Sequence, residues 1–238
     1  MISLHWLDAS PSSEFPPLDS ALTEPDGLLA AGGDLSGERL INAYQQGIFP
    51  WYSEGEPILW WSPDPRFILK PGEVKISRSL AKNLRNTTLT LRMDTAFDEL
   101  IANCSSQPRE GQPGTWISAD MKQAYIELHQ LGHAHSVECW EGDTLVGGLY
   151  GVHSGAVFCG ESMFSQQSNA SKIALVQLCR FLQHHGFKLI DSQVYTAHLE
   201  SLGARMIPRN KYIETLRQTT DITMPANWNE LFQQFLLS

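Results

Sequence analysis

The stretch FPWYSEGEPILWWSPDPRFIL, which runs from Phe49 to Leu69, decides how the chain is divided. It holds three tryptophans, Trp51, Trp60 and Trp61, together with four prolines. Because proline removes a backbone donor and fixes φ, the stretch cannot be one helix or one central strand. We therefore expect an ordered, proline-stiffened loop, with a short strand at Ile58–Trp60, that holds aromatic rings in place.

The sequence patterns on the two sides of this loop differ, which predicts two domains. On the N-terminal side, one convincing helix starts after Ser36 and ends at Gly47. On the C-terminal side, strand and helix patterns alternate, and three strand patterns over 134–159 are separated by the turns EGD and HSG, as in an antiparallel meander. We expect an α+β protein with a small domain over 1–65 and a larger domain with a mixed sheet over 66–238.

Composition and cysteine spacing exclude several classes of protein. With 42% hydrophobic and 18% charged residues the chain is an ordinary globular protein. It has neither a signal-peptide pattern nor an apolar run of about 20 residues, so we expect no membrane association and a cytoplasmic location. The four cysteines form no CxxC pair, which predicts reduced, buried thiols and no zinc site. Nothing in the sequence argues for an oligomer, so we expect a monomer.

One segment is basic although the chain as a whole is acidic, with a formal net charge of −9. Residues 70–92 include six basic side chains and one acidic side chain, which gives this segment a formal charge of +5. Arg78, Lys82 and Arg85 recur at helical spacing, which places them on one face, with Lys75 nearby. This face is either a solvated helix surface or a patch that contacts phosphates.

Two segments of the larger domain carry polar groups among apolar ones. In CGESMF (159–164), which we expect to be a loop at a strand end, the nucleophile-elbow pattern fails because Phe164 replaces its last glycine, so a serine hydrolase is a weak interpretation. Glu161 in that segment is costly to bury without a partner. In a predicted strand over 187–193, Asp191 and Gln193 share a face; their partners are either core groups or a substrate.

Three further residues carry weaker signals. His133 and His135 lie on one face, but without a third ligand we expect no metal site. Trp116 follows a loop rich in Gly and Pro, where it can pack against the core or stack on a flat ligand.

Ten motifs follow one another along the chain: EPDGLLAAGGDLS, AYQQGIFPWY, ILWWSPDPR, GTWI, LGHAHSVE, VGGLYG, CGESMFS, NASK, DSQV and HLESLGA. Taken together, they resemble those of the leucyl/phenylalanyl-tRNA–protein transferases. The resemblance covers about residues 24–208, and Ser192 stands where this family's pattern leads us to expect cysteine.

The resemblance implies an aminoacyltransferase that moves Leu or Phe, and Met less well, from aminoacyl-tRNA to the N-terminal Arg or Lys of proteins, marking them for N-end rule degradation. It implies an acetyltransferase-like (GNAT-like) C-terminal domain without a cofactor. The matching positions for binding the aminoacyl-adenosine are Trp51, Trp116, Tyr125 and Phe158. Those for the reaction are Asp191, Gln193 and Glu161, and with tRNA as donor we expect Lys75, Arg78, Lys82 and Arg85 to contact its phosphates.

Two alternatives stay open. A CoA-dependent acetyltransferase has the same order of elements, but the corresponding loop, GESMFSQQSNASK, lacks the glycines that hold a pyrophosphate. A non-catalytic module that binds RNA or degradation signals would need the basic face and the acidic pocket, yet would tolerate loss of Gln193.

Overall fold

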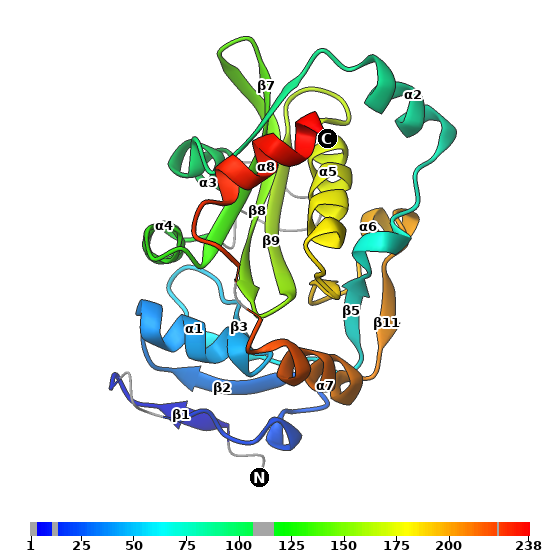
Figure 1. The fold of residues 1–238 in the computed structure, drawn as a ribbon. Coiled ribbons are helices and arrows are strands. Elements are labelled where there is room, and N and C mark those ends of the chain that lie inside the picture. Colours follow the sequence, from blue (N-terminus) through cyan, green and yellow to red (C-terminus); the bar gives the residue numbers. More distant parts are fainter. Residues whose placement is uncertain (1–3, 11–13, 107–116, 223) are drawn as a thin grey trace.

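Two β-sheets organise the chain in a computed structural model that describes residues 4–10, 14–106, 117–222 and 224–238 (Figure 1). The smaller, N-terminal sheet has the strand order β1-β2-β4-β3. Its strands are β1 (His5–Leu7), β2 (Leu28–Gly32), β3 (Phe49–Pro50) and β4 (Leu59–Trp61), and a short 3-10 helix, η1 (Leu18–Ser20), lies between β1 and β2.

The proline-rich stretch supplies two short antiparallel strands of this sheet: β4 overlaps the strand expected at Ile58–Trp60, and β3 was not expected. β3 pairs with β4, and the fully buried Trp60 donates its indole N–H to the carbonyl of Gly32 at 2.9 Å. The preceding helix, α1 (Gly37–Gln45), begins and ends as expected, because Ser36 accepts a hydrogen bond from the amide of Arg39 and Gly47 adopts a φ of +75°.

The larger sheet has the order β11-β5-β10-β9-β8-β7-β6, and within it only β9 and β10 are parallel neighbours. It is the mixed sheet that the sequence predicts. Its strands are β5 (Arg66–Leu69), β6 (Thr90–Met93), β7 (Ala134–Glu141), β8 (Thr144–Ser154), β9 (Val157–Ser165), β10 (Leu189–Asp191) and β11 (Arg205–Ile207).

Helices cover both faces of the larger sheet (Figure 1). α5 and α8 pack on one face, while α3, α4 and the N-terminal α1 pack on the other, so the small sheet joins the core on that side. The helices of this part of the chain are η2 (Pro71–Glu73), α2 (Arg78–Asn86), α3 (Phe97–Ser106), α4 (Ala119–Gln130), α5 (Ala170–His184), α6 (Ala197–Ser201), α7 (Arg209–Thr219) and α8 (Trp228–Leu237).

Three features differ from the sequence prediction. β9 continues to Ser165, so the expected loop at CGESMF is part of a strand. β10 stops at Asp191, which leaves Gln193 outside the strand in which we had placed it. The C-terminal helix α8 had no predicted counterpart; it is anchored by Trp228, whose ring stacks on His135 at 3.8 Å.

The described part of the chain shows the surroundings of the cysteines and of His135. All four cysteines are buried and free of disulfides. His135 pairs with Asp94 at 2.7 Å, and the described residues contain no group of three side chains suited to hold a metal ion. Over the same residues, no helix is both long and apolar enough to cross a membrane.

Candidate active site

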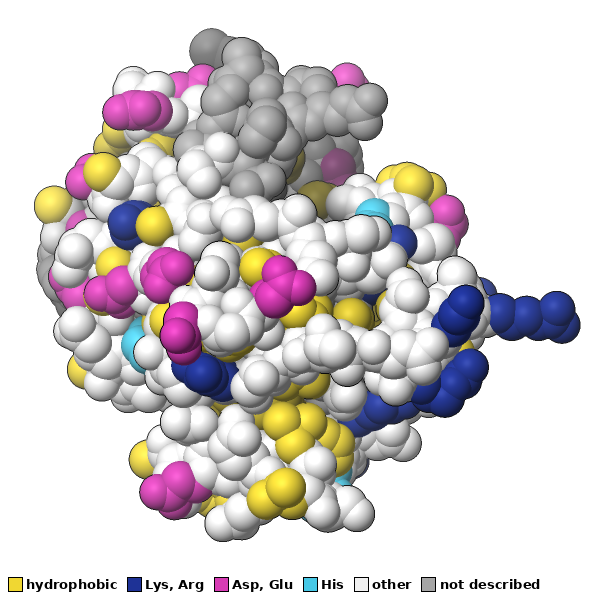
Figure 2. Space-filling model, turned by 90° about the horizontal axis from the view of Figure 1, so that it is seen from above, with side chains coloured by type: hydrophobic (Ala, Val, Ile, Leu, Met, Phe, Trp, Pro, Cys, Tyr) yellow, Lys and Arg dark blue, Asp and Glu magenta, His cyan; other side chains and the backbone are white. Residues whose placement is uncertain are grey.

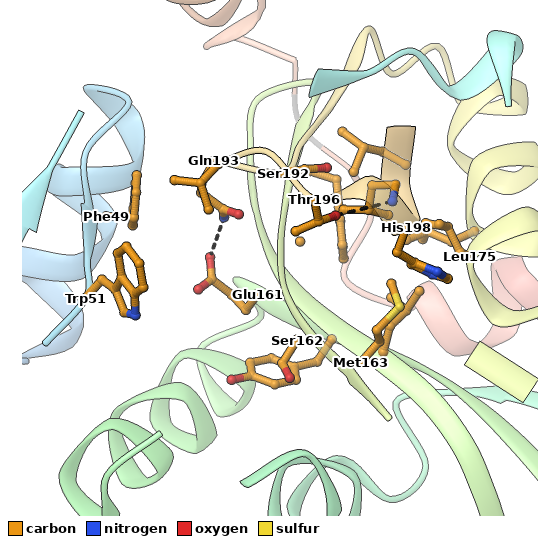
Figure 3. Close-up of a pocket in the computed structure, with 18 of the residues that line it drawn as sticks. Phe49, Trp51, Glu161, Ser162, Met163, Leu175, Ser192, Gln193, Thr196 and His198 are labelled. Carbon is orange, nitrogen blue, oxygen red and sulfur yellow. Dashed lines mark hydrogen bonds between the residues drawn. The ribbon is translucent and has the colours of Figure 1, made fainter. Parts of the chain in front are cut away.

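A pocket lies where β9 and β10 separate. The two strands pair only over 157–159 and 189–191; β9 then continues while the chain after β10 turns away. The gap is a cavity of about 580 Å³ at the carboxyl end of a parallel strand pair, a common place for ligands in α/β sheets. In Figure 3, Phe49 and Trp51 border one end, His198 and Leu175 the other, and Glu161 and Gln193 lie between them.

A β-bulge aims Glu161 into this cavity. Tyr150 of β8 pairs with Ser162 and Gly151 pairs with Gly160, so Glu161 is an extra residue without a partner across the strands. Bulges of this kind locally bend a strand and redirect a side chain. β8, the strand opposite the bulge, requires glycine at position 151, because a Cβ on this residue would lie 2.2 Å from the carbonyl oxygen of Cys159.

The carboxylate of Glu161 accepts hydrogen bonds from two sides. The hydroxyl of Tyr125 donates to Oε2 at 2.8 Å, and the side-chain amide of Gln193 donates to Oε1 at 3.2 Å. The hydroxyl of Tyr44, from α1, lies 2.8 Å from that of Tyr125. Burial raises the pKa of Glu161 to about 7, despite the opposing hydrogen bond from Tyr125. A carboxyl group with this pKa can exchange protons near neutral pH.

Gln193 reaches Glu161 because its backbone is left-handed, with a φ of +55°. Its backbone N–H donates to Oδ1 of Asp191 at 3.0 Å, whereas its side chain points to Glu161. The prediction that Asp191 and Gln193 share a strand face is therefore wrong. Asp191 is fully buried and does not line the cavity.

Asp191 forms a buried ion pair instead. Arg66, the first residue of β5, donates through Nε at 2.8 Å and through Nη2 at 2.7 Å, and the hydroxyl of Tyr212 from α7 donates at 2.9 Å. All three side chains are almost inaccessible to solvent. Burial alone would lower the pKa of Arg66, but the neighbouring Asp191 carboxylate raises it above its ordinary value.

The predicted aromatic residues take different positions. Trp51 and Phe158 line the cavity, and Trp51 is fixed by its backbone, which donates to Leu59 at 2.9 Å and accepts from the Trp61 indole at 2.7 Å. Tyr125 is fully buried behind Glu161 and is not part of the cavity wall. Trp116 lies outside the described residues.

The predicted basic residues lie apart from the cavity. Arg78, Lys82 and Arg85 are exposed on α2, and Lys75 is exposed just before this helix. None of the four forms an ion pair with a described residue. In Figure 2, Lys and Arg side chains gather on the side of the molecule where α2 lies.

Sequence reasoning missed residues that surround Glu161 and Asp191. Tyr44 hydrogen-bonds Tyr125 behind Glu161, whereas Arg66 and Tyr212 hydrogen-bond Asp191. An apolar part of the cavity wall comes from β8, β9, β10 and α5. A sequence signal for Arg66 did exist. This arginine directly precedes the apolar residues of one strand, and Asp191 directly follows the apolar residues of another, so the two charges could have been expected to pair. The apolar wall consists of Leu149, Phe158, Met163, Leu175, Leu178 and Ile190.

Comparison with known proteins shows the family to which the chain belongs. Residues 68–217 match the model described as leucyl/phenylalanyl-tRNA protein transferase, and residues 33–64 match the model of the N-terminal domain of that family. The chain belongs to the leucyl/phenylalanyl-tRNA protein transferase family.

Curated members of the family are similar over almost the whole chain. A Xanthomonas euvesicatoria protein named leucyl/phenylalanyl-tRNA–protein transferase is 52% identical and the match covers 98% of this chain and 93% of the relative. The protein of the same name from Aromatoleum aromaticum is 54% identical over 94% of both chains. Among solved structures, a protein of unknown function from Staphylococcus epidermidis has a TM-score of 0.42 and 7% identity, covering 76% of this chain and 68% of its own. A likeness at that TM-score does not define the fold.

The bulge geometry predicts that alanine at Gly151 and alanine at Gly160, which face each other across β8 and β9, change the stability of the protein to different extents. Gly151→Ala should lower the free energy of unfolding by about 1–3 kcal/mol, because its Cβ would collide with the backbone of Cys159 and the ring of Phe158. Gly160→Ala is the matched control, since its Cβ would meet no atom closer than 3.8 Å. Urea denaturation compares the two, and an equal loss of stability in both variants would contradict the bulge geometry.

Proposed function

We propose that this chain moves leucine or phenylalanine, and methionine less well, from aminoacyl-tRNA to the N-terminal Arg or Lys of a protein and so marks it for N-end rule degradation. The observation that carries the proposal is a cavity in a member of this family that holds one carboxylate and one amide, Glu161 and Gln193, between an aromatic end and an apolar end. The cavity thus offers a place for each part of the reaction.

The donor end of aminoacyl-tRNA fits the two halves of the cavity. The apolar wall formed by Met163, Leu175 and Leu178 suits a leucyl or phenylalanyl side chain, and Trp51 at the other end suits an adenine face. Selection by such a wall is worth only about 1–3 kcal/mol for each methylene, which is why methionine is tolerated.

The chemistry needs a proton acceptor of moderate strength, because the ester of aminoacyl-tRNA is already activated. The acceptor α-ammonium, with a pKa near 8, loses one proton to Glu161 and then attacks the ester carbonyl carbon. The new C–N bond forms, the bond to the ribose oxygen breaks, and a second proton passes to that oxygen. The amide nitrogen keeps the third proton, and Glu161 returns its own to solvent.

Gln193 positions the attacking amine. Its side-chain N–H₂ group is used by Glu161, which leaves its carbonyl oxygen to accept a hydrogen bond from the amine. An amide cannot act as a base, so this group contributes orientation and effective concentration. Asp191, which has no exposed surface, takes part through the backbone of Gln193.

The exposed basic residues near α2 are the proposed contact for tRNA. Their charges are unpaired within the described residues, and each released counterion favours binding to a polyanion. The acidic remainder of the chain suits an acceptor that begins with Arg or Lys. The residues concerned are Lys75, Arg78, Lys82 and Arg85.

The finer structural interpretation is also part of this proposal. We assign residues 66–238 to an acetyltransferase-like (GNAT-like) domain and 1–65 to a small N-terminal domain, acting as a cytoplasmic monomer without a cofactor. The separation of a parallel strand pair around an acyl-donor pocket, with a helix connecting the two strands, supports the assignment of the larger domain.

The direct test of the function is transfer of labelled leucine from leucyl-tRNA, without CoA, to two model proteins that begin with Arg and with Ala. We expect label only on the protein that begins with Arg. Label on neither protein, with tRNA still bound, would favour a non-catalytic binding module. A dependence on CoA would favour an acetyltransferase.

The proposed base predicts a pH dependence. Because Glu161 must be deprotonated, kcat with saturating acceptor should rise with pH through an apparent pKa of about 7. Glu161→Gln should remove this inflection and lower kcat by about 10²-fold or more. Glu127→Gln, on the exposed side of α4, is the control and should keep the profile of the unsubstituted chain. An unchanged profile for Glu161→Gln would refute the assigned role.

The proposed tRNA contact predicts a change in salt dependence. Lys82→Ala should weaken binding of every tRNA to a similar extent and reduce the slope of log K against log salt by about 0.9. Lys211→Ala is the control, because Lys211 lies on α7 and pairs with Glu214 at 2.9 Å. If Lys82→Ala and Lys211→Ala gave equal slopes of log K against log salt, the proposal that α2 contacts tRNA would be contradicted.

A further inference from the structure

We propose that Arg66 and Tyr212 are positioning residues for acyl transfer: they hold Asp191 so that its carboxylate keeps Gln193 in the left-handed conformation that aims its amide at Glu161. We call Arg66, Tyr212 and Asp191 the clamp. This inference rests on the proposed function and assigns work to two residues that lie outside the cavity wall.

The first step is that Asp191 has no free position for a substrate. Its Oδ1 accepts from Nε of Arg66 and from the backbone N–H of Gln193, at 2.8 and 3.0 Å. Its Oδ2 accepts from Nη2 of Arg66 and from the hydroxyl of Tyr212, at 2.7 and 2.9 Å. With four donors and no accessible surface, this carboxylate cannot bind the acceptor ammonium or take its proton. It acts through the group that it holds.

The second step is that Gln193 needs to be held. A residue with a side chain pays about 1–2 kcal/mol to adopt left-handed φ, so a φ of +55° persists only where the surroundings fix it. The fixing contacts are the bond from its N–H to Asp191 and a backbone bond from Phe67 to its carbonyl at 3.3 Å. In an extended conformation the side chain would leave Glu161, from which its amide nitrogen is now 3.2 Å away.

The third step is that the clamp is fixed in turn by two parts of the molecule. The guanidinium of Arg66 lies 4.8 Å from the ring centre of Phe49, in the small sheet, and 4.7 Å from that of Tyr212, in α7. Rings on a planar cation stabilise its orientation. Its remaining nitrogen, Nη1, meets no acceptor in the described part of the chain, so the hydrogen bonds of Arg66 to side chains go to Asp191 alone.

The test is a double-mutant cycle on the single-turnover rate of leucyl transfer. Tyr212→Phe keeps the ring on Arg66 but removes one donor to Asp191, and we expect it to lower the rate about tenfold. In a Gln193→Ala background the same substitution should change the rate less than twofold, because the clamp acts only through Gln193. A residue with a merely structural role would lower the rate by the same factor in both backgrounds.

Two further measurements separate positioning from loss of folding or of donor binding. The Kd of a phenylalanyl-adenosine analogue should change less than twofold in Tyr212→Phe, and thermal unfolding reports whether each variant is folded. Arg66→Lys should behave like Tyr212→Phe or worse, because lysine cannot form the two-point contact. The matched control is Arg39→Lys, which alters a buried arginine paired with Asp34 in the small domain and should keep the rate of the unsubstituted chain.

Equal losses from Tyr212→Phe in both backgrounds would overturn the clamp while leaving the proposed function intact, as would an undiminished rate in Tyr212→Phe. Absence of leucyl transfer by the unsubstituted chain would instead overturn the proposed function, and the inference with it.

Discussion

The ion pair between Arg66 and Asp191 is the constraint on which the site depends. It joins two neighbouring antiparallel strands, β5 and β10, inside the protein, where neither charge reaches water. Burying two charges is expensive, and removing one partner of such a pair typically costs about 3–5 kcal/mol. The surroundings therefore have to stabilise both charges. Phe49 of the small sheet packs on Arg66, and Asp191 accepts hydrogen bonds from Tyr212 of α7 and from the backbone of Gln193.

From this pair, hydrogen bonds lead step by step to the cavity. Asp191 fixes the backbone of Gln193, the amide of Gln193 contacts Glu161, and Glu161 is held from behind by Tyr125, which meets Tyr44 of α1. The two carboxylates thereby have different surroundings. One is saturated with donors and rigid, and the other faces the cavity with a pKa of about 7. Environments that separate two carboxyl groups in this way are typical of acid–base sites.

Much of the fold follows from local sequence patterns. The cap at Ser36, the turns of the meander and the proline-stiffened stretch after Phe49 all act over a few residues, and the structure places elements where they predict. The candidate site residues Glu161 and Gln193 could also be predicted from the sequence, because polar groups in apolar segments require partners.

The sequence could not reveal the features that depend on register or on distant partners. The bulge at Glu161 is a property of how β8 and β9 align, and no local signal distinguishes it from a loop. The left-handed turn at Gln193 depends on a carboxylate that Arg66, 125 residues earlier in the chain, holds in place. A strand pattern extended past Asp191 therefore put both polar groups on one face, whereas the structure buries Asp191 and places Gln193 in the cavity wall.

The most direct measurement is a crystal structure of the chain with a non-hydrolysable phenylalanyl-adenosine analogue. The account predicts the phenyl ring against Met163, Leu175 and Leu178, the adenine near Trp51, and the carbonyl carbon beside Glu161 and Gln193. It also predicts that Asp191 keeps its four donors and does not touch the analogue. An analogue bound outside this cavity, or in contact with Asp191, would contradict the account.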